Sequence, residues 1–377
     1  MIVGIPKEIK NRERRVALTP EGAANIAKDG HKVLIEQGAG LGSGFTDADY
    51  RTAGACIVPT AVEAWDAELV VKVKEPLAVE YSFLKPNLCL FTFLHLAAVQ
   101  ELVPLLLQKK VCAIAYETVQ LDHGSLPLLA PMSRVAGRVA AQMGAYLLQA
   151  ENGTPFPGKG KLMGGVDGVP PARVLIIGGG NAGRSAADVA LGMGAEVCVL
   201  DASEACVGSL QKSFGERGRA GVFSMDAMLS ELDGCDLLIG ATLMVGEHAA
   251  HLLDKERLAR MHGGVFVDIA IDQGGISSTS RPTSYAKPVY VEAGVLHCCL
   301  PNLPACVPLS ATRALTHATL PFVQMLADQG VESAIKSSLR GDGALARGVN
   351  TWDGHIAHSG VAHALNQPCV PLSDMLG

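Results

Sequence analysis

The sequence lacks the features of several common protein classes. Charged residues make up only 18% of its 377 residues and the net charge is −6, so no basic excess exists to neutralise nucleic-acid phosphates. No apolar run approaches the ~18 residues that a membrane-spanning helix needs. The first residues, MIVGIPKE, begin a strand-like pattern at once and lack the basic-then-apolar order of a signal peptide. We therefore expect a cytoplasmic protein that binds neither nucleic acid nor membranes.

Metal-site, disulfide and hydrolase patterns are missing as well. The ten cysteines form no C-x-x-C pair and mostly lie inside apolar stretches, which is typical of reduced core residues. The spacings His248-x-x-His251 and His355-x-x-His358 have no neighbouring carboxylate or cysteine that would complete a ligand set. No G-x-S-x-G motif supplies a hydrolase nucleophile. The sequence therefore predicts no metal and no disulfide framework.

What the chain does contain is typical of an α/β protein. Apolar residues make up 49% of a chain long enough for two domains, each with its own core. Short apolar segments alternate with helical patterns, which predicts parallel sheets. One helix is expected to start after Thr19 as N-cap, with Pro20 in its first turn. The strands expected before residue 128 are Ile2–Ile5, Lys32–Glu36, Leu69–Lys74, Leu88–Leu94 and Val111–Tyr116.

Two long helical patterns suggest where the chain passes between domains. Residues 133–150 predict one helix with Ser133 as N-cap, and residues 312–329 predict another that returns to the first domain. We expect cofactor and substrate to bind in a cleft between the domains, where such sites usually lie. The expected domains are a discontinuous one of residues 1–128 plus 309–377 and a second of residues 129–308.

The stretch RVLIIGGGNAGRSAADVALGMGAEVCVLD, residues 173–201, carries a dinucleotide-binding pattern. An apolar strand leads into Gly178, Gly180 and Gly183, which form G-x-G-x-x-G before a helical segment. The glycines allow a tight turn, the approach of a pyrophosphate and close helix packing, and the helix N-terminus favours phosphate. A second strand ends on Asp201, where a carboxylate accepts hydrogen bonds from ribose and repels a 2′-phosphate. The pattern predicts NAD rather than NADP.

Two other glycine-rich segments fall short of a phosphate-binding motif. In residues 38–44 a serine, Ser43, occupies the place of the third glycine, so we interpret this segment as a flexible turn. In residues 153–160 a glycine, Gly160, occupies the place of the P-loop hydroxyl residue, and we expect a surface loop.

Several polar residues at predicted strand ends could handle a substrate. Arg15 follows the first strand, and its guanidinium suits a carboxylate, although a solvated arginine is an equal alternative. Of Lys72 and Lys74, the second lies at the strand tip and is the better candidate. His95 is bracketed by leucines, which is also typical of a core histidine.

In the second domain, VDIAIDQGG places Asp268 and Asp272 after an apolar strand, and Asp272 has the greater freedom to act as an acid or base.

The motifs MIVGIPKEIKNRERRVALTP, HKVLIEQGAGLGSGFTDADY, LVVKVKEP, FTFLHLAA, IAYETVQ, LPLLAPMS, VDIAIDQGG and SRPT, in this order, closely resemble the alanine dehydrogenase family. The resemblance implies two Rossmann-like domains with parallel sheets, the substrate domain being built from both chain ends and the other domain binding NAD. It implies reversible, NAD-dependent oxidative deamination of L-alanine to pyruvate and ammonia. It also implies a homo-oligomer, a hexamer.

The resemblance also implies roles for particular residues. Arg15 and Lys74 would bind the substrate carboxylate and carbonyl, and His95 with Asp272 would form the catalytic pair. The residues that would line the NAD site are Ser133, Gly178, Gly180, Gly183, Asp201, Ser224, Ile269, Arg281 and Asn302.

The chain departs from the family pattern at four places. Arg134 follows Ser133 where the family usually has Glu, Cys206 replaces a frequent basic residue, and the segments 244–248 and 301–312 are altered. These changes leave two alternatives open: a related dehydrogenase of another small L-amino acid, and a transhydrogenase-like NAD-binding subunit.

Overall fold

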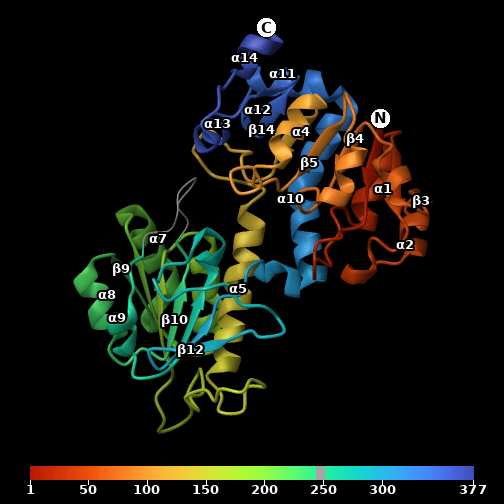
Figure 1. Cartoon of the computed structure of the whole chain (residues 1–377). Helices are drawn as coiled ribbons and strands as arrows, with labels where there is room; N and C mark the ends of the chain where they lie inside the picture. Colours follow the sequence, from red (N-terminus) through yellow and green to blue (C-terminus); the bar gives the residue numbers. More distant parts are fainter. Residues whose placement is uncertain (243–250) are drawn as a thin grey trace. The chain divides into compact units, whose positions relative to one another are not determined.

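The computed structural model describes residues 1–242 and 251–377 and divides the chain into two compact units. Unit 1 comprises Met1–Met132 and Ala305–Gly377, and unit 2 comprises Ser133–Pro304 (Figure 1). The chain passes between them at 132/133 and 304/305, where the sequence placed the passages at 128/129 and 308/309. None of the helices in the described residues has the length and apolar character needed to cross a membrane.

Unit 1 is built on an eight-stranded sheet in the order β15-β14-β6-β5-β4-β1-β2-β3. Six of its strands are parallel, and the last two pair antiparallel at one edge. The parallel strands are β1 (Ile2–Ile5), β2 (Lys32–Glu36), β3 (Cys56–Val58), β4 (Leu69–Val71), β5 (Cys89–Thr92) and β6 (Cys112–Ala115). The antiparallel strands are β14 (Val349–Trp352) and β15 (His355–Ile356). The buried central strands are short apolar runs, as expected for a parallel sheet covered on both faces.

The expected strand over residues 69–74 is wrong at its end. Strand β4 stops at Val71, because the N–H groups of Val73 and Lys74 turn to the Glu8 carboxylate, at 2.6 and 3.4 Å. Strands β3, β14 and β15 were not expected, since β3 is only partly buried and β14 carries polar residues in its centre. A strand with polar residues in its middle is not recognised by a pattern that depends on consecutive apolar residues.

The helices of unit 1 include α1 and α10, whose starting residues can be compared with the prediction. Helix α1 (Pro20–Lys28) starts as predicted, with the Thr19 hydroxyl accepting the N–H of Gly22 at 3.1 Å. Helix α10 (Pro308–Gln329) begins earlier than expected, because Pro308 is well suited to a first helical position. The other helices are α2 (Asp47–Thr52), α3 (Ala61–Trp65), α4 (Leu102–Gln108), α11 (Val331–Arg340), α12 (Ala344–Arg347), α13 (Ser359–Leu365) and α14 (Leu372–Leu376).

Unit 2 has a seven-stranded sheet in the order β12-β13-β11-β10-β7-β8-β9. All neighbours are parallel except the edge strand β12. Its strands are β7 (Arg173–Ile177), β8 (Glu196–Asp201), β9 (Gly218–Val222), β10 (Leu237–Gly240), β11 (Val265–Asp268), β12 (Tyr290–Glu292) and β13 (Val295–Cys298). The chain runs outward from β7 through β9 and then returns to β10 on the other side of β7. Nucleotides bind at such switch points, at the carboxyl ends of the strands.

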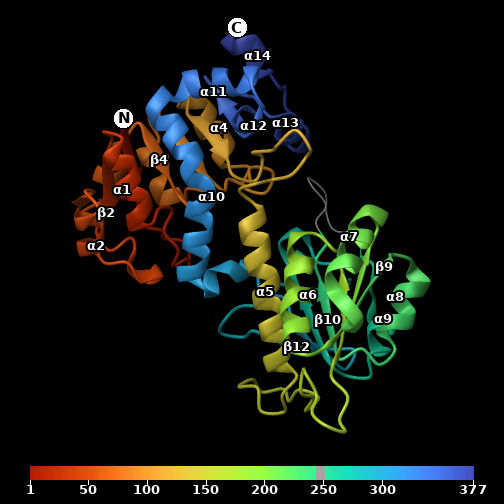
Figure 2. The same cartoon turned by 180° about the vertical axis from the view of Figure 1, so that it is seen from behind.

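Helix α5 (Ala130–Leu147) begins earlier than the sequence indicated, and the prediction of Ser133 as its N-cap is wrong. The N–H of Ala130 donates to Leu126 O at 3.0 Å, and the next residue, Pro131, has no N–H to leave unpaired in the first turn. Figure 2 shows α5 beside α6 (Asn181–Gly192), where a Cβ on Gly137 would lie 1.9 Å from Ala182 O. The remaining helices of unit 2 are α7 (Glu204–Phe214), α8 (Met225–Leu232) and α9 (Lys255–Ala259).

Candidate active site

The glycine loop between β7 and α6 depends on glycine at two of its three motif positions. Gly178 has φ 101°, and a Cβ there would lie 2.6 Å from Ala241 O. A Cβ on Gly183 would lie 1.8 Å from Gly178 O, so only glycine lets the helix pack on the loop. A Cβ on Gly180, by contrast, would meet no atom of the described residues within 4 Å. The loop therefore leaves open space beside the N-terminus of α6, where a pyrophosphate would fit.

Asp201 at the end of β8 is fixed against this loop. Its Oδ2 accepts the N–H of Gly179 at 2.6 Å, and its Oδ1 accepts the N–H of Ser203 at 2.8 Å. Each oxygen keeps a further lone pair that could accept a ribose hydroxyl. The Cys206 thiol donates to Gly179 O at 3.2 Å, so it packs under the loop and brings no positive charge.

Two of the other expected NAD residues already have structural partners in unit 2. Ser224 is the N-cap of α8, with its hydroxyl accepting the N–H of Ala227 at 3.1 Å. The guanidinium of Arg281 lies 3.7 Å from the ring centroid of Tyr290 and 3.6 Å from the Glu292 carboxylate. Neither interaction excludes a cofactor contact, because both side chains remain exposed.

The remaining three expected NAD residues lie at or just before the starts of helical elements. Ser133 is in the first turn of α5, and the adjacent Arg134 donates to Asn181 Oδ1 at 3.2 Å, which ties α5 to the start of α6. Ile269 is half-buried and begins the 3₁₀ turn η4 (Ile269–Gln273). Asn302 has φ 56°, a left-handed conformation that asparagine tolerates.

Asp268 and Asp272 at the end of β11 have different environments. Asp268 is buried and hydrogen-bonded, whereas Asp272 lies in η4 with its side chain exposed. None of the described residues hydrogen-bonds to the Asp272 carboxylate. The sequence favoured Asp272 as the freer group, and its position leaves it available for a substrate or a water molecule.

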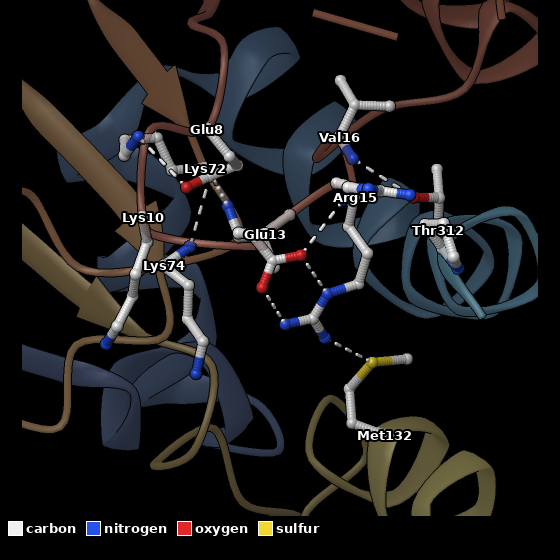
Figure 3. A network of polar contacts seen from close by, with 12 residues as sticks. Glu8, Lys10, Glu13, Arg15, Val16, Lys72, Lys74, Met132 and Thr312 are labelled. Atoms are coloured by element: carbon white, nitrogen blue, oxygen red, sulfur yellow. Dashed lines mark hydrogen bonds and ion pairs between the residues drawn. The ribbon is translucent and has the colours of Figure 1, made fainter. Parts of the chain in front are cut away.

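Figure 3 shows the polar network around Arg15 in unit 1. The Arg15 side chain is only 2% exposed and forms a bidentate pair with Glu13, through Nε at 2.7 Å and Nη2 at 2.6 Å. Its Nη1 donates to Met132 Sδ at 3.2 Å. The alternative of a solvated surface arginine is therefore wrong. Glu13 sets the plane of the guanidinium before any substrate arrives.

The segment that contains Arg15 is anchored to α10. The N–H groups of Val16 and Thr19 donate to the hydroxyls of Thr312 and Thr316, both at 3.1 Å. Ser43, in the glycine-rich segment 38–44, is buried and donates to Arg14 O at 3.0 Å. That segment is therefore packed into unit 1, whereas the sequence suggested a flexible turn.

Lys72 is a structural lysine. Its ammonium lies between Glu80 Oε1 at 2.9 Å and Glu8 Oε2 at 3.4 Å, completely buried. Burial alone would lower the pKa of Lys72, but Glu8 and Glu80 raise it, so the side chain stays charged. Since Glu8 also accepts the N–H groups of Val73 and Lys74, this ion cluster fixes the backbone just before the next lysine.

Lys74 lies half-buried in the same network, and its side chain extends in the same direction as that of Arg15 (Figure 3). In the described part of the chain its ammonium has no hydrogen-bond or ion-pair partner. Burial and then the nearby Arg15 lower the pKa of Lys74. A partly buried cation beside a second cation is stabilised when an anion binds, so these two side chains are suited to a carboxylate.

His95 is not a core histidine, because its side chain is 42% exposed. It has φ 49°, and the Glu117 carboxylate holds this turn by accepting the N–H groups of His95 at 2.6 Å and Leu94 at 3.2 Å. The imidazole stacks on Phe93, with 5.8 Å between ring centroids. The ring therefore has a defined orientation and an open edge.

Sequence reasoning missed three carboxylates that hold these groups: Glu8, Glu13 and Glu117. Glu117 directly follows the apolar run 111–116, which is the same strand-end signal that identified Lys74 and Asp272. Glu8 and Glu13 follow β1 in the same way. The sequence does not show which groups these carboxylates bind. The groups that Glu8 and Glu117 bind are far away in the chain, and Glu13 has several charged residues close to it in sequence.

Each unit gathers its candidate groups at the carboxyl ends of parallel strands. In unit 1, Arg15, Lys74 and His95 follow β1, β4 and β5, which are neighbours in the sheet. In unit 2, the glycine loop, Asp201 and Asp272 follow β7, β8 and β11. Asp272 and His95 thus belong to different units, and their pairing stays a prediction.

Within residues 1–242 and 251–377 no three His, Cys, Asp or Glu side chains gather in a way that could hold a metal ion. The altered segment 244–248 and the His248-x-x-His251 spacing lie wholly or partly outside the described residues.

Family models and full-length relatives match this chain. Residues 4–136 match the family description "Alanine dehydrogenase/PNT, N-terminal domain", and residues 140–359 match "Alanine dehydrogenase/PNT, C-terminal domain". The chain is 47% identical to an alanine dehydrogenase of Staphylococcus haemolyticus, covering 100% of this chain and 99% of that protein. It is also 47% identical to alanine dehydrogenase 2 of Staphylococcus aureus, covering 97% and 96%.

Two solved structures share the fold. An L-alanine dehydrogenase matches with a TM-score of 0.91 and 44% identity, over 97% of this chain and 99% of that one. A transhydrogenase from Sinorhizobium meliloti matches with a TM-score of 0.78 at 24% identity, over 95% and 99%, which is a likeness of fold alone. From its two family domains and its full-length relatives, the chain belongs to the alanine dehydrogenase/PNT family.

Proposed function

We propose that this protein is an NAD-dependent alanine dehydrogenase, which converts L-alanine and water reversibly to pyruvate and ammonia. The observation that carries the proposal is the pair of cations in unit 1, a fixed Arg15 and a Lys74 whose ammonium has no partner among the described residues. Both follow strands of one sheet, and His95 follows the neighbouring strand β5. A small 2-amino acid or 2-oxo acid needs such a site for its carboxylate and its reacting carbon. Among such substrates we propose alanine, because the relatives are named alanine dehydrogenase.

Unit 2 supplies the site proposed for NAD. The glycine loop and the N-terminus of α6 would hold the pyrophosphate, and Asp201 would accept the ribose hydroxyls. Ser133, Ser224, Ile269, Arg281 and Asn302 are proposed to line the rest of the site. When bound, NAD supplies a hydride acceptor for the substrate Cα.

The residues of the chain handle charge and protons. Arg15 would hold the substrate carboxylate, and Lys74 would face the carbinolamine oxygen, which gains negative charge as it loses its proton and ammonia leaves. His95, with Asp272, would accept a proton from the attacking water and return one to the departing ammonia. The mechanism requires these groups from both units to act on one substrate molecule.

In a panel of L-amino acids, alanine is expected to give the fastest NADH production by the purified protein. A small pocket separates substrates that differ by one methylene by only about 1–3 kcal/mol, so serine or 2-aminobutyrate should show weaker activity. The altered segment 301–312 makes another small amino acid the main rival. A different amino acid that outpaces alanine tenfold would establish that rival instead, and no turnover with any would favour the transhydrogenase-like alternative.

The Asp201→Asn and Asp201→Gly variants test the preference for NAD. Removing the carboxylate charge should raise activity with NADP relative to NAD, because the repulsion of a 2′-phosphate is lost. Asn keeps one acceptor for the N–H of Gly179 or Ser203, whereas Gly keeps none, so the Gly variant should also bind NAD more weakly. An unchanged ratio of kcat/KM values for the two cofactors in both variants would place Asp201 away from the ribose.

The family resemblance further supports a homo-hexamer in the cytoplasm. Light scattering on the eluted protein would measure the oligomer mass against the 39.3 kDa chain.

A further inference from the structure

Asp268 has no part in the chemistry proposed above, yet it makes three hydrogen bonds at the end of β11. Its Oδ1 accepts the N–H of Ala270 at 3.1 Å, and its Oδ2 accepts the N–H of Ile276 at 2.9 Å and the hydroxyl of Ser280 at 2.6 Å. The residue is only 1% exposed, so these protein donors replace water around a buried carboxyl group.

The donors lie on both sides of the short segment that contains Asp272. Ala270 precedes Asp272 by two residues, and Ile276 follows it by four. The N–H of Gly275 also donates to Ala270 O at 3.1 Å, which closes the same segment through the backbone. One carboxyl group thus joins the beginning and the end of the segment 270–276.

Two glycines show that this site is built closely around the carboxyl group. A Cβ on Gly275, which has φ 81°, would lie 2.5 Å from Asp268 Oδ2. A Cβ on Gly240, at the end of β10, would lie 2.9 Å from Asp268 Oδ1. Side chains at either position would displace the carboxyl group, so the second glycine of the QGG motif is needed here for reasons unrelated to a cofactor.

We propose that Asp268 is a positioning residue for the reaction, which holds Asp272 in place by fixing both ends of the segment 270–276. The inference rests on the proposed catalytic role of Asp272. It extends that role by assigning the first aspartate of the motif a separate function from the second.

The positioning function requires the ionised form, because a protonated carboxyl oxygen cannot accept all these hydrogen bonds equally well. Burial raises the pKa of Asp268 from 3.8 to about 6, against the lowering effect of its hydrogen bonds and of His251. The other titratable neighbour among the described residues is Cys299, and burial raises the pKa of that thiol to about 11, so it stays neutral.

The raised pKa of Asp268 makes the stability of the folded protein depend on pH. Since the folded-state pKa lies above the ordinary value, the contribution of Asp268 to stability falls as the pH rises from about 4 to about 6. At neutral pH the protein therefore keeps an ionised group that costs stability, which is more typical of a functional residue than of a structural one.

The Asp268→Asn variant separates the two roles. The amide places an N–H where one carboxylate oxygen accepted a hydrogen bond, so the segment should loosen and kcat should fall by up to about 10²-fold at pH 8. The thermal midpoint at pH 8 should stay the same or rise, because a buried charge is removed. A purely structural residue would show the opposite pattern, with a lower midpoint and an unchanged kcat.

Asp236→Asn is the matched control. Asp236 is also a buried carboxylate of unit 2, and it accepts the N–H of Arg173 at 3.0 Å and pairs with Lys159 at 2.9 Å. It precedes β10 and so lies at the opposite, amino edge of the sheet. We expect this variant to lose thermal stability and to keep kcat.

Ser280→Ala provides a second test if Asp268→Asn fails to fold. It removes a hydrogen bond that lowers the pKa of Asp268, so the acid limb of the kcat profile should move to higher pH. A folded Asp268→Asn protein with full kcat, or an acid limb that Ser280→Ala leaves in place, would overturn the inference. If Asp272→Asn is itself fully active, the proposed function of Asp272 fails first, and the inference fails with it.

Discussion

Replacing Asp272 with Asn is expected to lower kcat by about 10²–10⁴, the usual range for the loss of a general acid or base. Asn keeps the size of the side chain and removes the charge that would stabilise a protonated His95 and orient water. Rates of NADH formation with saturating alanine would measure the effect. NAD affinity, from fluorescence titration, should change little, because the proposed phosphate and ribose contacts lie at other strand ends.

The Asp272→Asn substitution should affect activity without affecting stability. The Asp272 side chain is exposed, so the thermal midpoint of the variant should equal that of the parent protein. His95→Ala should reduce kcat to a similar extent, and the double variant should be little worse than either, as expected for residues that act as a unit. Full activity of a folded Asp272→Asn protein would refute the mechanism, and additive losses would separate the two residues.

The second large effect is expected for Lys74→Met. Removing one partner of a partly buried charge pair costs roughly 2–5 kcal/mol, so kcat/KM for pyruvate and for alanine should fall by about 30- to 5,000-fold. Met retains most of the length and apolar volume of the lysine side chain. Lys85→Met is the matched control in unit 1, because Lys85 is a partly exposed lysine that pairs with Asp66 at 2.6 Å. That variant should keep kcat/KM.

The pH dependence of substrate binding tests the same residue. Burial and Arg15 lower the pKa of Lys74, so the ammonium loses its proton at a lower pH than an ordinary lysine does. A carboxylate needs the protonated form, and its affinity should therefore decrease as the pH rises through this lowered pKa. The alkaline limb in log kcat/KM should disappear in Lys74→Met. If the limb persists there unchanged, it belongs to another group.

Much of the fold could be read from local sequence. Strands β1 and β2 have the predicted bounds, because an apolar run in a parallel sheet is bounded by residues that cannot continue it. The Thr19 cap and the glycine loop after β7 were also recognisable, since hydroxyl caps and tight turns depend on residues only a few positions apart. The alternation of apolar segments and helical patterns predicted the α/β class, and the family resemblance then implied two Rossmann-like domains.

Other features depended on contacts between distant parts of the chain. β4 ends early because the Glu8 carboxylate, from the segment after β1, accepts the N–H groups of Val73 and Lys74. Helix α5 starts early because Leu126 O accepts the N–H of Ala130. Neither partner is marked by a local pattern. Strand β14, which lies between β15 and β6, could not be recognised for the same reason, since its polar residues are paired only within the folded sheet.

For the candidate site, the sequence identified which residue types stand at strand ends, and the tertiary structure decided their state. Lys72 and Lys74 look alike in the sequence, but two buried glutamates neutralise the first and leave the second without a partner in the described residues. Asp268 and Asp272 divide in the same way between a buried, hydrogen-bonded group and an exposed one. The physical reason is that burial and ion pairing depend on three-dimensional neighbours, whereas strand ends and glycine turns depend on the chain itself.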